Sequence, residues 1–238
     1  MTYKIKPLQS IGDVETKEIL RSAAKAHKAL GELKGLAMSM PNQNILLATL
    51  SLQEAKQSSE IENIITTQDD LYQSNHQTNH FTTMSAKEVH NYARALKEGF
   101  SLVNDSGLLT NSTIIKIQQI IENNDAGFRT QAGTTLKNSQ TQEVIYTPPQ
   151  TTTEVQKLMS DLEKFMNDES LSSYDILVKM ALIHHQFESI HPFYDGNGRT
   201  GRILNIIYLS KNQILGTPIL YLSRYINKNK SQYYALLQ

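Results

Sequence analysis

Apolar residues recur at helical spacing along most of this 238-residue chain, and no other feature constrains its fold as much. Between Tyr174 and Ser189, for example, Ile176, Met180 and Ile183 fall on one stripe, as in an amphipathic α-helix. Comparable patterns predict further helices over residues 14–40, 44–65, from 85, 111–123, from 151, 199–211 and after 218. The sequence therefore predicts an all-α fold.

One segment departs from the helical pattern. Residues 129–149 are first rich in Thr, Gly, Asn and Ser and then carry the β-branched and aromatic run Glu143 to Thr147, which predicts a short hairpin. The polar residues 66–84 predict a loop. Two capping boxes, Ser85–Glu88 and Thr151–Glu154, are expected to open helices. The predicted fold class is thus all-α (mainly helical) with one small β-hairpin.

Composition narrows the classes of partner. Lys plus Arg and Asp plus Glu number 23 each, so the net charge is zero, whereas a protein that coats nucleic acid would be basic. The absence of cysteine excludes disulfides, thiolate nucleophiles and Cys-ligated zinc. No apolar run approaches the ~20 residues of a membrane span, and the N-terminus has no apolar signal-peptide stretch. We therefore expect a cytoplasmic protein that binds neither a membrane nor nucleic acid.

Positive charge is concentrated towards the C-terminus. From Gly196 to Gln238 there is no acidic residue, and the segment carries a charge of +6. An anionic ligand at one site accounts for such a local excess in a neutral protein. A solvated basic surface is the alternative interpretation.

The stretch from His191 to Arg202, HPFYDGNGRTGR, concentrates the groups that can carry chemistry. It opens a predicted helix, so its glycines expose backbone N–H groups at the positive end of a helix dipole, which is an anion site. Arg199 and Arg202 project from one face of the first turn and can bind phosphate bidentately. Asp195 is a suitable Mg²⁺ ligand, and His191 is the side chain here that takes up a proton near neutral pH.

Two common nucleotide-binding motifs do not describe this stretch. The spacing Gly196-x-Gly198-x-x-Gly201 matches the dinucleotide fingerprint, but that fingerprint follows a strand and precedes an acidic residue by about 20 positions. Here a predicted helix precedes the glycines and no acid follows them. The P-loop pattern is absent from the sequence.

The stretch resembles the signature of the Fic family, His-x-Phe-x-(Asp/Glu)-Gly-Asn-(Gly/Lys)-Arg-x-x-Arg, with every position filled. Glu188 to Ile190, Pro148-Pro149 and the tail from Tyr225 to Lys230 are also similar, so the resemblance spans about residues 10–238. It implies a protein adenylyltransferase, which transfers AMP from ATP to a Ser, Thr or Tyr hydroxyl of a target protein.

The resemblance also implies a role for each residue of the signature. His191 would be the general base, for which a pKa near 6.5 leaves a mostly neutral imidazole at pH 7. Asp195 would hold Mg²⁺, the expected cofactor. The nucleotide-binding set would be Gly196, Asn197, Gly198, Arg199, Thr200, Gly201, Arg202 and Asn229. Within it, residues 196–198 form an anion hole, the arginines hold the outer phosphates, and Asn229 contacts the adenosine.

The predicted helix over about residues 44–65 resembles the inhibitory helix of the same family. Ser58, Glu62 and Asn63 fill its motif, (Ser/Thr)-x-x-x-Glu-(Gly/Asn). In relatives this Glu pairs with the second motif arginine and displaces the γ-phosphate, so Glu62 is expected to pair with Arg202. ATP would then bind misaligned, and about 1 Å of misalignment can cost 10²-fold in rate. An ordinary surface glutamate is the alternative interpretation.

The resemblance further implies how the chain is organised. Residues 1–84 would form an N-terminal region with the inhibitory helix, packed as one unit with a Fic core over 85–238. The chain stops at Leu236-Leu237-Gln238 within an apolar helical pattern, so we expect a missing C-terminal domain. The hairpin around residues 141–146 would be the flap that adds the target backbone as a strand. Relatives often dimerise and modify themselves, so a homodimer and self-modification are implied as well.

Two other functions stay open at this level. In the first, the fold is kept and the reaction changes, because some relatives remove AMP and others transfer UMP, phosphocholine or a phosphate. Release of AMP from a modified target would separate these cases. In the second, the chain is a regulatory module without catalysis, linked to DNA through the missing domain, although intact His191 and both arginines argue against it.

Overall fold

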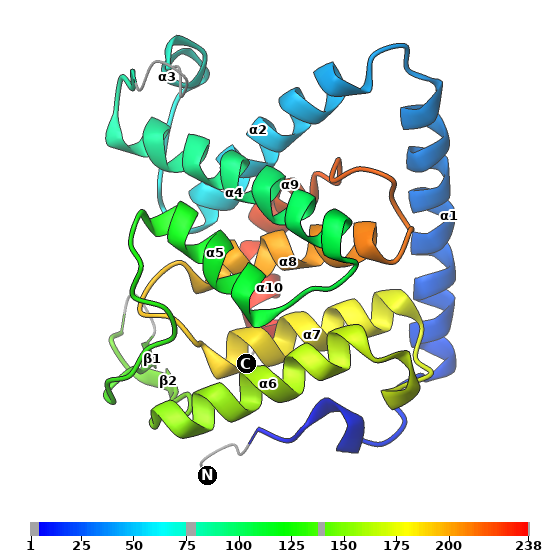
Figure 1. The fold of residues 1–238 in the computed structure, drawn as a ribbon, viewed down its shortest axis with the longest axis vertical. Coiled ribbons are helices and arrows are strands. Elements are labelled where there is room, and N and C mark those ends of the chain that lie inside the picture. Colours follow the sequence, from blue (N-terminus) through cyan, green and yellow to red (C-terminus); the bar gives the residue numbers. More distant parts are fainter. Residues whose placement is uncertain (1–4, 75–79, 138–140, 238) are drawn as a thin grey trace.

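A computed structural model describes residues 5–74, 80–137 and 141–237. The described part is mainly helical with one small two-stranded sheet (Figure 1), so the predicted fold class is confirmed. The elements in chain order are η1 (Leu8–Ser10), α1 (Lys17–Ser39), α2 (Gln43–Ile61), α3 (Gln68–Gln73), α4 (Met84–Ser106), α5 (Asn111–Glu122), β1 (Leu136–Lys137), β2 (Val144–Tyr146), α6 (Thr152–Asn167), η2 (Glu169–Leu171), α7 (Ile176–Ile190), α8 (Asn197–Lys211), α9 (Leu222–Lys228) and α10 (Lys230–Leu237). No helix among these is long and apolar enough to cross a membrane.

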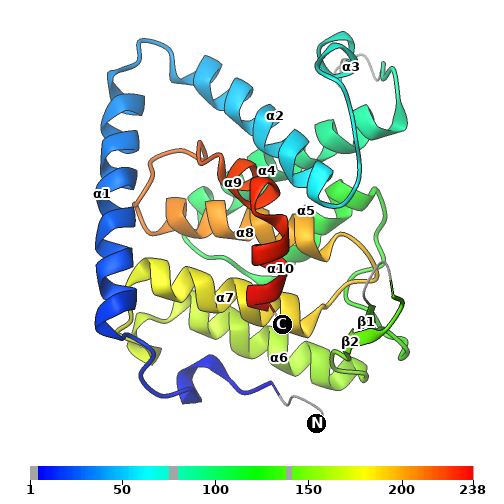
Figure 2. The same ribbon diagram turned by 180° about the vertical axis from the view of Figure 1, so that it is seen from behind.

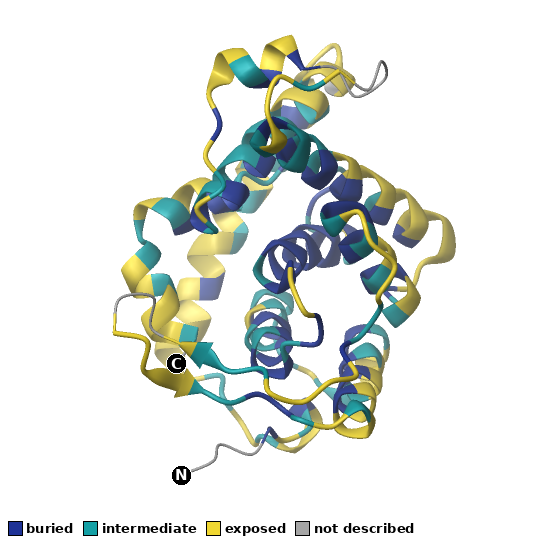
Figure 3. Ribbon diagram, turned by 90° about the vertical axis from the view of Figure 1, so that its left-hand side faces the viewer, coloured by how far each residue is buried: buried dark blue, intermediate teal, exposed yellow. Residues whose placement is uncertain are grey.

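Helix α8 forms the centre of the fold. Every residue from Arg199 to Ser210 is buried, so the helix is covered on all sides. Helices α4 and α5 pack on one side of it and α9 and α10 lie on the other, as the two opposite views show (Figures 1 and 2). In Figure 3 the buried residues, in dark blue, gather around the centre of the molecule, and the exposed residues, in yellow, lie towards the outside.

Close packing around α8 depends on one glycine. A Cβ added to Gly99 of α4 would lie 2.7–2.8 Å from the side chains of Ile117 on α5 and Ile207 on α8. The missing side chain therefore sets how closely these three helices approach each other. In this way the apolar stripes of α4 and α5 are buried against the helix that begins with the signature.

Two predicted features of the segment around residues 66–88 are wrong. The hydroxyl of Thr83 accepts the N–H of Ala86 and caps α4, so the expected Ser85–Glu88 capping box does not open this helix. Thr83 occupies the N-cap position, and Ser85 therefore lies inside the first turn. Helix α3 lies within the expected loop, where a capping box of Thr67 and Asp70 starts it. By contrast, Thr151 caps α6 as predicted.

Helix α2 ends earlier than the expected residue 65. Asn63 follows the helix at φ 64°, a left-handed conformation that Asn tolerates better than most side chains. The N–H of Ile64 then bonds to the carbonyl of Ser59 at 3.0 Å, which closes the last turn. Similarly, the single helix expected at the C-terminus consists of α9 and α10, with Asn229 as the C-cap between them.

The hairpin pairs β1 with β2 in antiparallel fashion, with Leu136 opposite Tyr146. Its connecting residues 138–140 lie outside the described residues. Val144 and Ile145 are 54% and 42% exposed, so β2 presents apolar side chains to solvent. On the N-terminal side, α2 packs against α4 and α9, and α1 follows one edge of the molecule (Figure 2). The division into regions at residue 84 stays a prediction.

Candidate active site

The signature forms the turn between α7 and α8. His191 is the C-cap of α7 in a left-handed conformation, with φ 49° and ψ 60°. Gly196 caps the start of α8 at φ 79°, where a side chain would be strained and would also touch Glu122. Two residues with positive φ thus reverse the chain and bring the imidazole to the side of the α8 N-terminus.

Asn197 and Phe193 hold this turn together. The Asn197 side chain accepts the N–H of Phe193 and donates to its carbonyl, both at 2.9 Å. The Phe193 ring is fully buried between Phe128 and Phe187. The Asn197 amide is therefore occupied by the loop itself, and only its backbone N–H is left for the anion hole that the signature implies.

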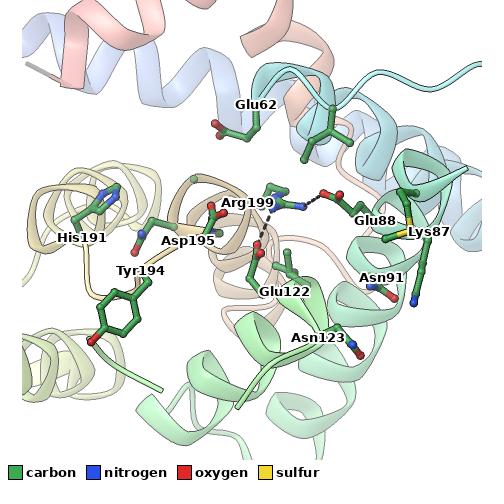
Figure 4. Close-up of a pocket in the computed structure, with 16 residues that line it drawn as sticks. Glu62, Lys87, Glu88, Asn91, Glu122, Asn123, His191, Tyr194, Asp195 and Arg199 are labelled. Atoms are coloured by element: carbon green, nitrogen blue, oxygen red, sulfur yellow. Dashed lines mark hydrogen bonds and ion pairs between the residues drawn. The ribbon is translucent and has the colours of Figure 1, made fainter. Parts of the chain in front are cut away.

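A pocket of about 580 Å³ lies over the N-terminus of α8. His191 and Asp195 line it from the α7–α8 turn, Glu62 from the end of α2, and Glu122 from the end of α5 (Figure 4). Its other lining residues are Ile64, Met84, Lys87, Glu88, Asn91, Ile121, Asn123, Tyr194, Gly196, Asn197, Gly198 and Arg199. The pocket thus combines an imidazole, several carboxylates and the first-turn N–H groups of α8, which have no partner one turn earlier.

Arg202 is held by the predicted inhibitory residues. Its Nε donates to Ser58 Oγ at 2.8 Å, and its Nη2 donates to the Ser58 carbonyl at 2.9 Å and to Glu62 Oε1 at 2.8 Å. Arg202 is buried, whereas the Glu62 side chain is 34% exposed. The Glu62 carboxylate also lies so close to Gly198 that a Cβ there would meet it. An acidic group therefore lies over the helix N-terminus, where an anion is electrostatically favoured.

Arg199 is held by two carboxylates that sequence patterns did not indicate as site residues. Its Nη1 donates to Glu88 Oε2 at 3.1 Å and its Nη2 donates to Glu122 Oε1 at 2.6 Å, as the dashed lines in Figure 4 show. The Arg199 side chain is 5% exposed and that of Glu122 is 14% exposed. Burial, together with the nearby Asp195 and Glu88 and against the charge of Arg199, raises the pKa of Glu122. Both signature arginines are thus paired with carboxylates.

The environment of His191 favours its neutral form. Burial, and then the positive charge of Arg129, lower the pKa of the imidazole to about 4. The carbonyl of Glu188 and the carboxylates of Glu62 and Asp195 act in the opposite direction. A neutral imidazole can accept a proton over the whole physiological pH range.

Four residues predicted to bind the nucleotide do not line the pocket, namely Thr200, Gly201, Arg202 and Asn229. Arg202 is buried and is held by Ser58 and Glu62. Thr200 is fully buried inside the fold, and Gly201 packs against Phe187 and Glu188 of α7. Helical geometry explains both placements, because residues 200 and 201 point away from the face that carries 199 and 202. Asn229 lies at the junction of α9 and α10, where its amide donates to the Tyr225 carbonyl at 2.8 Å. Asn63 shapes the end of α2 and does not contact Arg202 through any described hydrogen bond.

Asp195 fits the requirements of a Mg²⁺ ligand. Its carboxylate lines the pocket, and one oxygen accepts the N–H of Gly196 at 2.7 Å, which fixes the side chain and leaves the second oxygen available. Mg²⁺ is commonly bound through one or two carboxylates together with substrate phosphates. In the described part of the chain no group of three or more His, Asp or Glu side chains could hold a metal without such phosphates.

The residues missed at the sequence level come from distant segments. Glu88, Glu122 and Arg129 reach the signature from α4, α5 and the segment after α5. Glu122 and Arg129 have no local pattern that distinguishes them from a solvent-exposed charge, and Glu88 was expected only as part of a capping box. Only the packing of α4 and α5 on α8 brings them to the site.

Family comparisons agree with this architecture. The family model described as "Fic/DOC family N-terminal" matches residues 20–101, and that described as "Fic/DOC family" matches residues 108–209. The chain belongs to the Fic/DOC family.

Solved structures with the same fold include a Fic family protein from Desulfovibrio desulfuricans and Fic-1 from Caenorhabditis elegans. The Desulfovibrio protein aligns with a TM-score of 0.75 at 22% identity, and the alignment covers 94% of this chain and 67% of that protein's chain. Fic-1 aligns with a TM-score of 0.62 at 17% identity, and the alignment covers 94% of this chain and 74% of the Fic-1 chain. These similarities show the fold.

Curated relatives share shorter stretches. A probable protein adenylyltransferase of Aquifex aeolicus is 36% identical over 73 residues, which are 31% of this chain and 22% of that protein. The protein adenylyltransferase Fic of Drosophila erecta is 35% identical over 81 residues, which are 34% of this chain and 15% of that protein. The chain therefore matches less than a quarter of the length of these relatives.

Proposed function

We propose that the chain is a protein adenylyltransferase, which uses Mg²⁺ and ATP to place AMP on a Ser, Thr or Tyr hydroxyl of a target protein, itself included. The observation that carries this proposal is the meeting of a neutral imidazole, an available carboxylate and the anion-binding start of α8 in one pocket. The names of the curated relatives support the same reaction class.

In the proposed reaction, the target hydroxyl oxygen attacks the α-phosphorus of ATP. The new P–O bond forms, the bond from the α-phosphorus to the bridging oxygen of the β-phosphate breaks, and pyrophosphate leaves. His191 takes the hydroxyl proton. A pKa of about 4 makes it a weak base in the free protein, but the negative charge of bound phosphates would raise that pKa. A positioned base of this kind contributes about 10²- to 10⁴-fold.

The remaining groups would bind the triphosphate. Arg199 and Arg202 match phosphate oxygens geometrically, and the N–H groups at the start of α8 favour negative charge. Asp195 would hold Mg²⁺, which supplies charge neutralisation between adjacent phosphates when bound. Donors that are oriented before the reaction stabilise charge that develops on the phosphates.

The flap is proposed to receive the target. Strand β2 exposes Val144 and Ile145, and an extended target segment can add to such an edge through backbone hydrogen bonds. The hydroxyl that reacts would then belong to a residue whose backbone lies along this strand.

We propose in addition that Glu62 inhibits the transfer. Its carboxylate occupies Arg202 and lies beside Gly198, so a γ-phosphate cannot bind both groups until Glu62 moves. Ser58 accepts from Nε through its hydroxyl and, through its carbonyl, from the same Nη2 that donates to Glu62. ATP bound against this contact would be misaligned at the α-phosphorus.

The test is transfer of label from ATP labelled at the α-phosphate, with Mg²⁺, into the protein and into proteins of a cell extract. Label in the parent or in Glu62→Gly, and none in the matching His191→Ala variant, is the expected result. Arg94→Gln, on the exposed face of α4, is the control that retains label. Bound ATP without any transferred label would contradict the proposal, and release of AMP from a modified target would indicate hydrolytic removal of AMP instead.

A further inference from the structure

Arg129, which the proposed mechanism does not use, is among the largest fully buried side chains of the protein. It lies in the segment between α5 and β1 and is 1% exposed. A guanidinium stays ionised inside a protein, and an ionised group is costly to bury without compensation. No carboxylate forms an ion pair with Arg129 in the part of the chain that the structure describes. Its compensation therefore comes from other groups.

Backbone carbonyls supply that compensation. The Nε of Arg129 donates to the His191 carbonyl at 2.8 Å, and its Nη2 donates to the carbonyls of Ile190, at 3.3 Å, and Pro149. The backbone N–H of Arg129 donates to the Pro192 carbonyl at 2.8 Å. One residue thus binds three consecutive carbonyls, those of residues 190–192, at the point where α7 ends.

These carbonyls belong to the turn that sets the direction of the His191 side chain. The last carbonyls of a helix have no partner within the helix, and they form the negative end of its dipole, which a cation stabilises. His191 itself has the left-handed conformation, which is unfavourable for a residue with a side chain. Arg129 holds the peptide groups on both sides of that residue. It therefore stabilises the turn that aims the imidazole into the pocket.

The same segment joins the base of the hairpin to the signature loop. The N–H groups of Thr130 and Gln131 donate to the Tyr194 hydroxyl at 2.9 and 3.1 Å. Pro149, which follows β2, is bound by the Arg129 guanidinium. The two ends of the hairpin are thus fixed to the loop that carries His191.

The charge of Arg129 acts on the imidazole as well. After burial, it is the largest influence that lowers the pKa of His191, while Glu62 and Asp195 raise that pKa. The groups that face Arg129 itself are Tyr194, Glu154 and Tyr146, which partly offset the effect of its burial. Removal of the guanidinium charge would therefore move the ionisation of His191 to higher pH.

We infer that Arg129 is a positioning residue, which fixes the left-handed turn at His191 and ties the hairpin base to the same loop. The inference rests on the proposed function for the role of His191 as the base. The contact between Arg129 and the turn is a separate claim, and it can be tested without any transfer activity.

The experiment compares Arg129→Gln and Arg129→Lys, each in the Glu62→Gly background, with Arg94→Gln as the matched control for loss of an exposed arginine. Arg129→Gln is expected to lower kcat for transfer by about 100-fold, because the base is misplaced, while the Kd for ATP changes by less than about twofold. Arg129→Lys keeps the charge and one hydrogen bond and is expected to recover part of kcat. Arg94→Gln should leave kcat and Kd unchanged.

The readout that is independent of activity is the NMR titration of the His191 ring, assigned by the signal that is lost in His191→Ala. In Arg129→Gln this titration should move to higher pH, and in Arg94→Gln it should not move. Unchanged titration together with unchanged kcat, or a loss that lies wholly in ATP affinity, would overturn the inference. If Arg129→Gln fails to fold, Arg129→Lys is the deciding variant. A lower kcat in an Arg129→Lys protein whose NMR spectrum is that of a folded chain would support the inference, and an unchanged kcat would contradict it. If the Glu62→Gly parent transfers no label, the proposed function fails, and the titration still decides on Arg129.

Discussion

The contact between Glu62 and Arg202 sets the expected magnitude of the proposed inhibition. A hydrogen bond to a charged group contributes about 1.5–3 kcal/mol, but the Glu62 side chain is 34% exposed and is therefore partly screened by water. We take about 1–2 kcal/mol for the contact, which corresponds to roughly a 5- to 30-fold change in an equilibrium. Because the γ-phosphate is proposed to compete for the same guanidinium, Glu62→Gly should raise kcat/KM for transfer by this factor.

The assay is the initial rate of label transfer from α-labelled ATP at subsaturating nucleotide, for the parent, Glu62→Gly and Glu62→Gln. An amide can still accept from Arg202 but has no charge, so Glu62→Gln should have an intermediate rate. Glu98→Gln removes an exposed carboxylate of α4 and controls for the change in net charge. Glu62→Gly should stay folded, with a Tm lower by roughly 2–8 °C, the shift expected for loss of about 1–2 kcal/mol in a chain of this size.

Equal rates for the parent and Glu62→Gly would contradict inhibition by Glu62, since Arg202 would then bind phosphate equally well with and without the carboxylate. A comparable rise in Glu98→Gln would also refute it, because the effect would belong to overall charge. A rise in Glu62→Gly with no rise in Glu62→Gln would mean that the carboxylate acts by its volume beside Gly198 and not by its charge.

Two further predictions concern carboxyl groups near the arginines. Glu122→Gln frees Arg199 from a carboxylate 2.6 Å away and should tighten the binding of Mg²⁺–ATP about fivefold, as measured by calorimetry. The control Glu98→Gln should leave this affinity unchanged. Weaker binding in Glu122→Gln would contradict the prediction, because Glu122 would then orient Arg199 for the nucleotide. Burial raises the pKa of Glu188 to about 7, so the folded chain retains a proton that the unfolded chain releases near pH 4.5. The stability from this group is therefore complete below pH 4.5 and is lost as the pH rises through 7. Between about pH 6 and 8.5 the parent should lose about 1 kcal/mol in urea unfolding that Glu188→Gln does not lose.

Local patterns predicted the parts of the fold that short-range interactions decide. The apolar stripe of Ile176, Met180 and Ile183 and the hydroxyl of Thr151 correctly indicated helices, because periodicity and capping act within a few residues. The exact ends of the helices do not follow from such short-range patterns alone. Thr83 and Ser85 are both good N-cap residues, and the choice between them depends on how α4 packs, with Ala86 fully buried.

The site was predictable only where its residues are close in sequence. The stretch from His191 to Arg202 forms one turn, so its chemistry could be inferred from spacing. The contacts of Arg202 with Ser58 and Glu62 span 140 residues or more, and only the family resemblance suggested them. Neither spacing nor the family resemblance indicated Glu122, because its place beside Gly196 results from the packing of α5 on α8.

The carboxylate partners of the two arginines bear on how ATP would be selected. In this structure Arg199 is bound by Glu88 and Glu122 and Arg202 by Glu62, so the positive charge of the signature is already compensated before any nucleotide arrives. Binding of a triphosphate would exchange one set of anions for another, and the net gain in charge attraction would be small. Discrimination then depends on geometry, namely on phosphate oxygens that reach both guanidiniums and the N–H groups of α8 together. Under the proposed function, several linked phosphates would replace the carboxylates on both arginines together, whereas a single phosphate would replace those on one arginine.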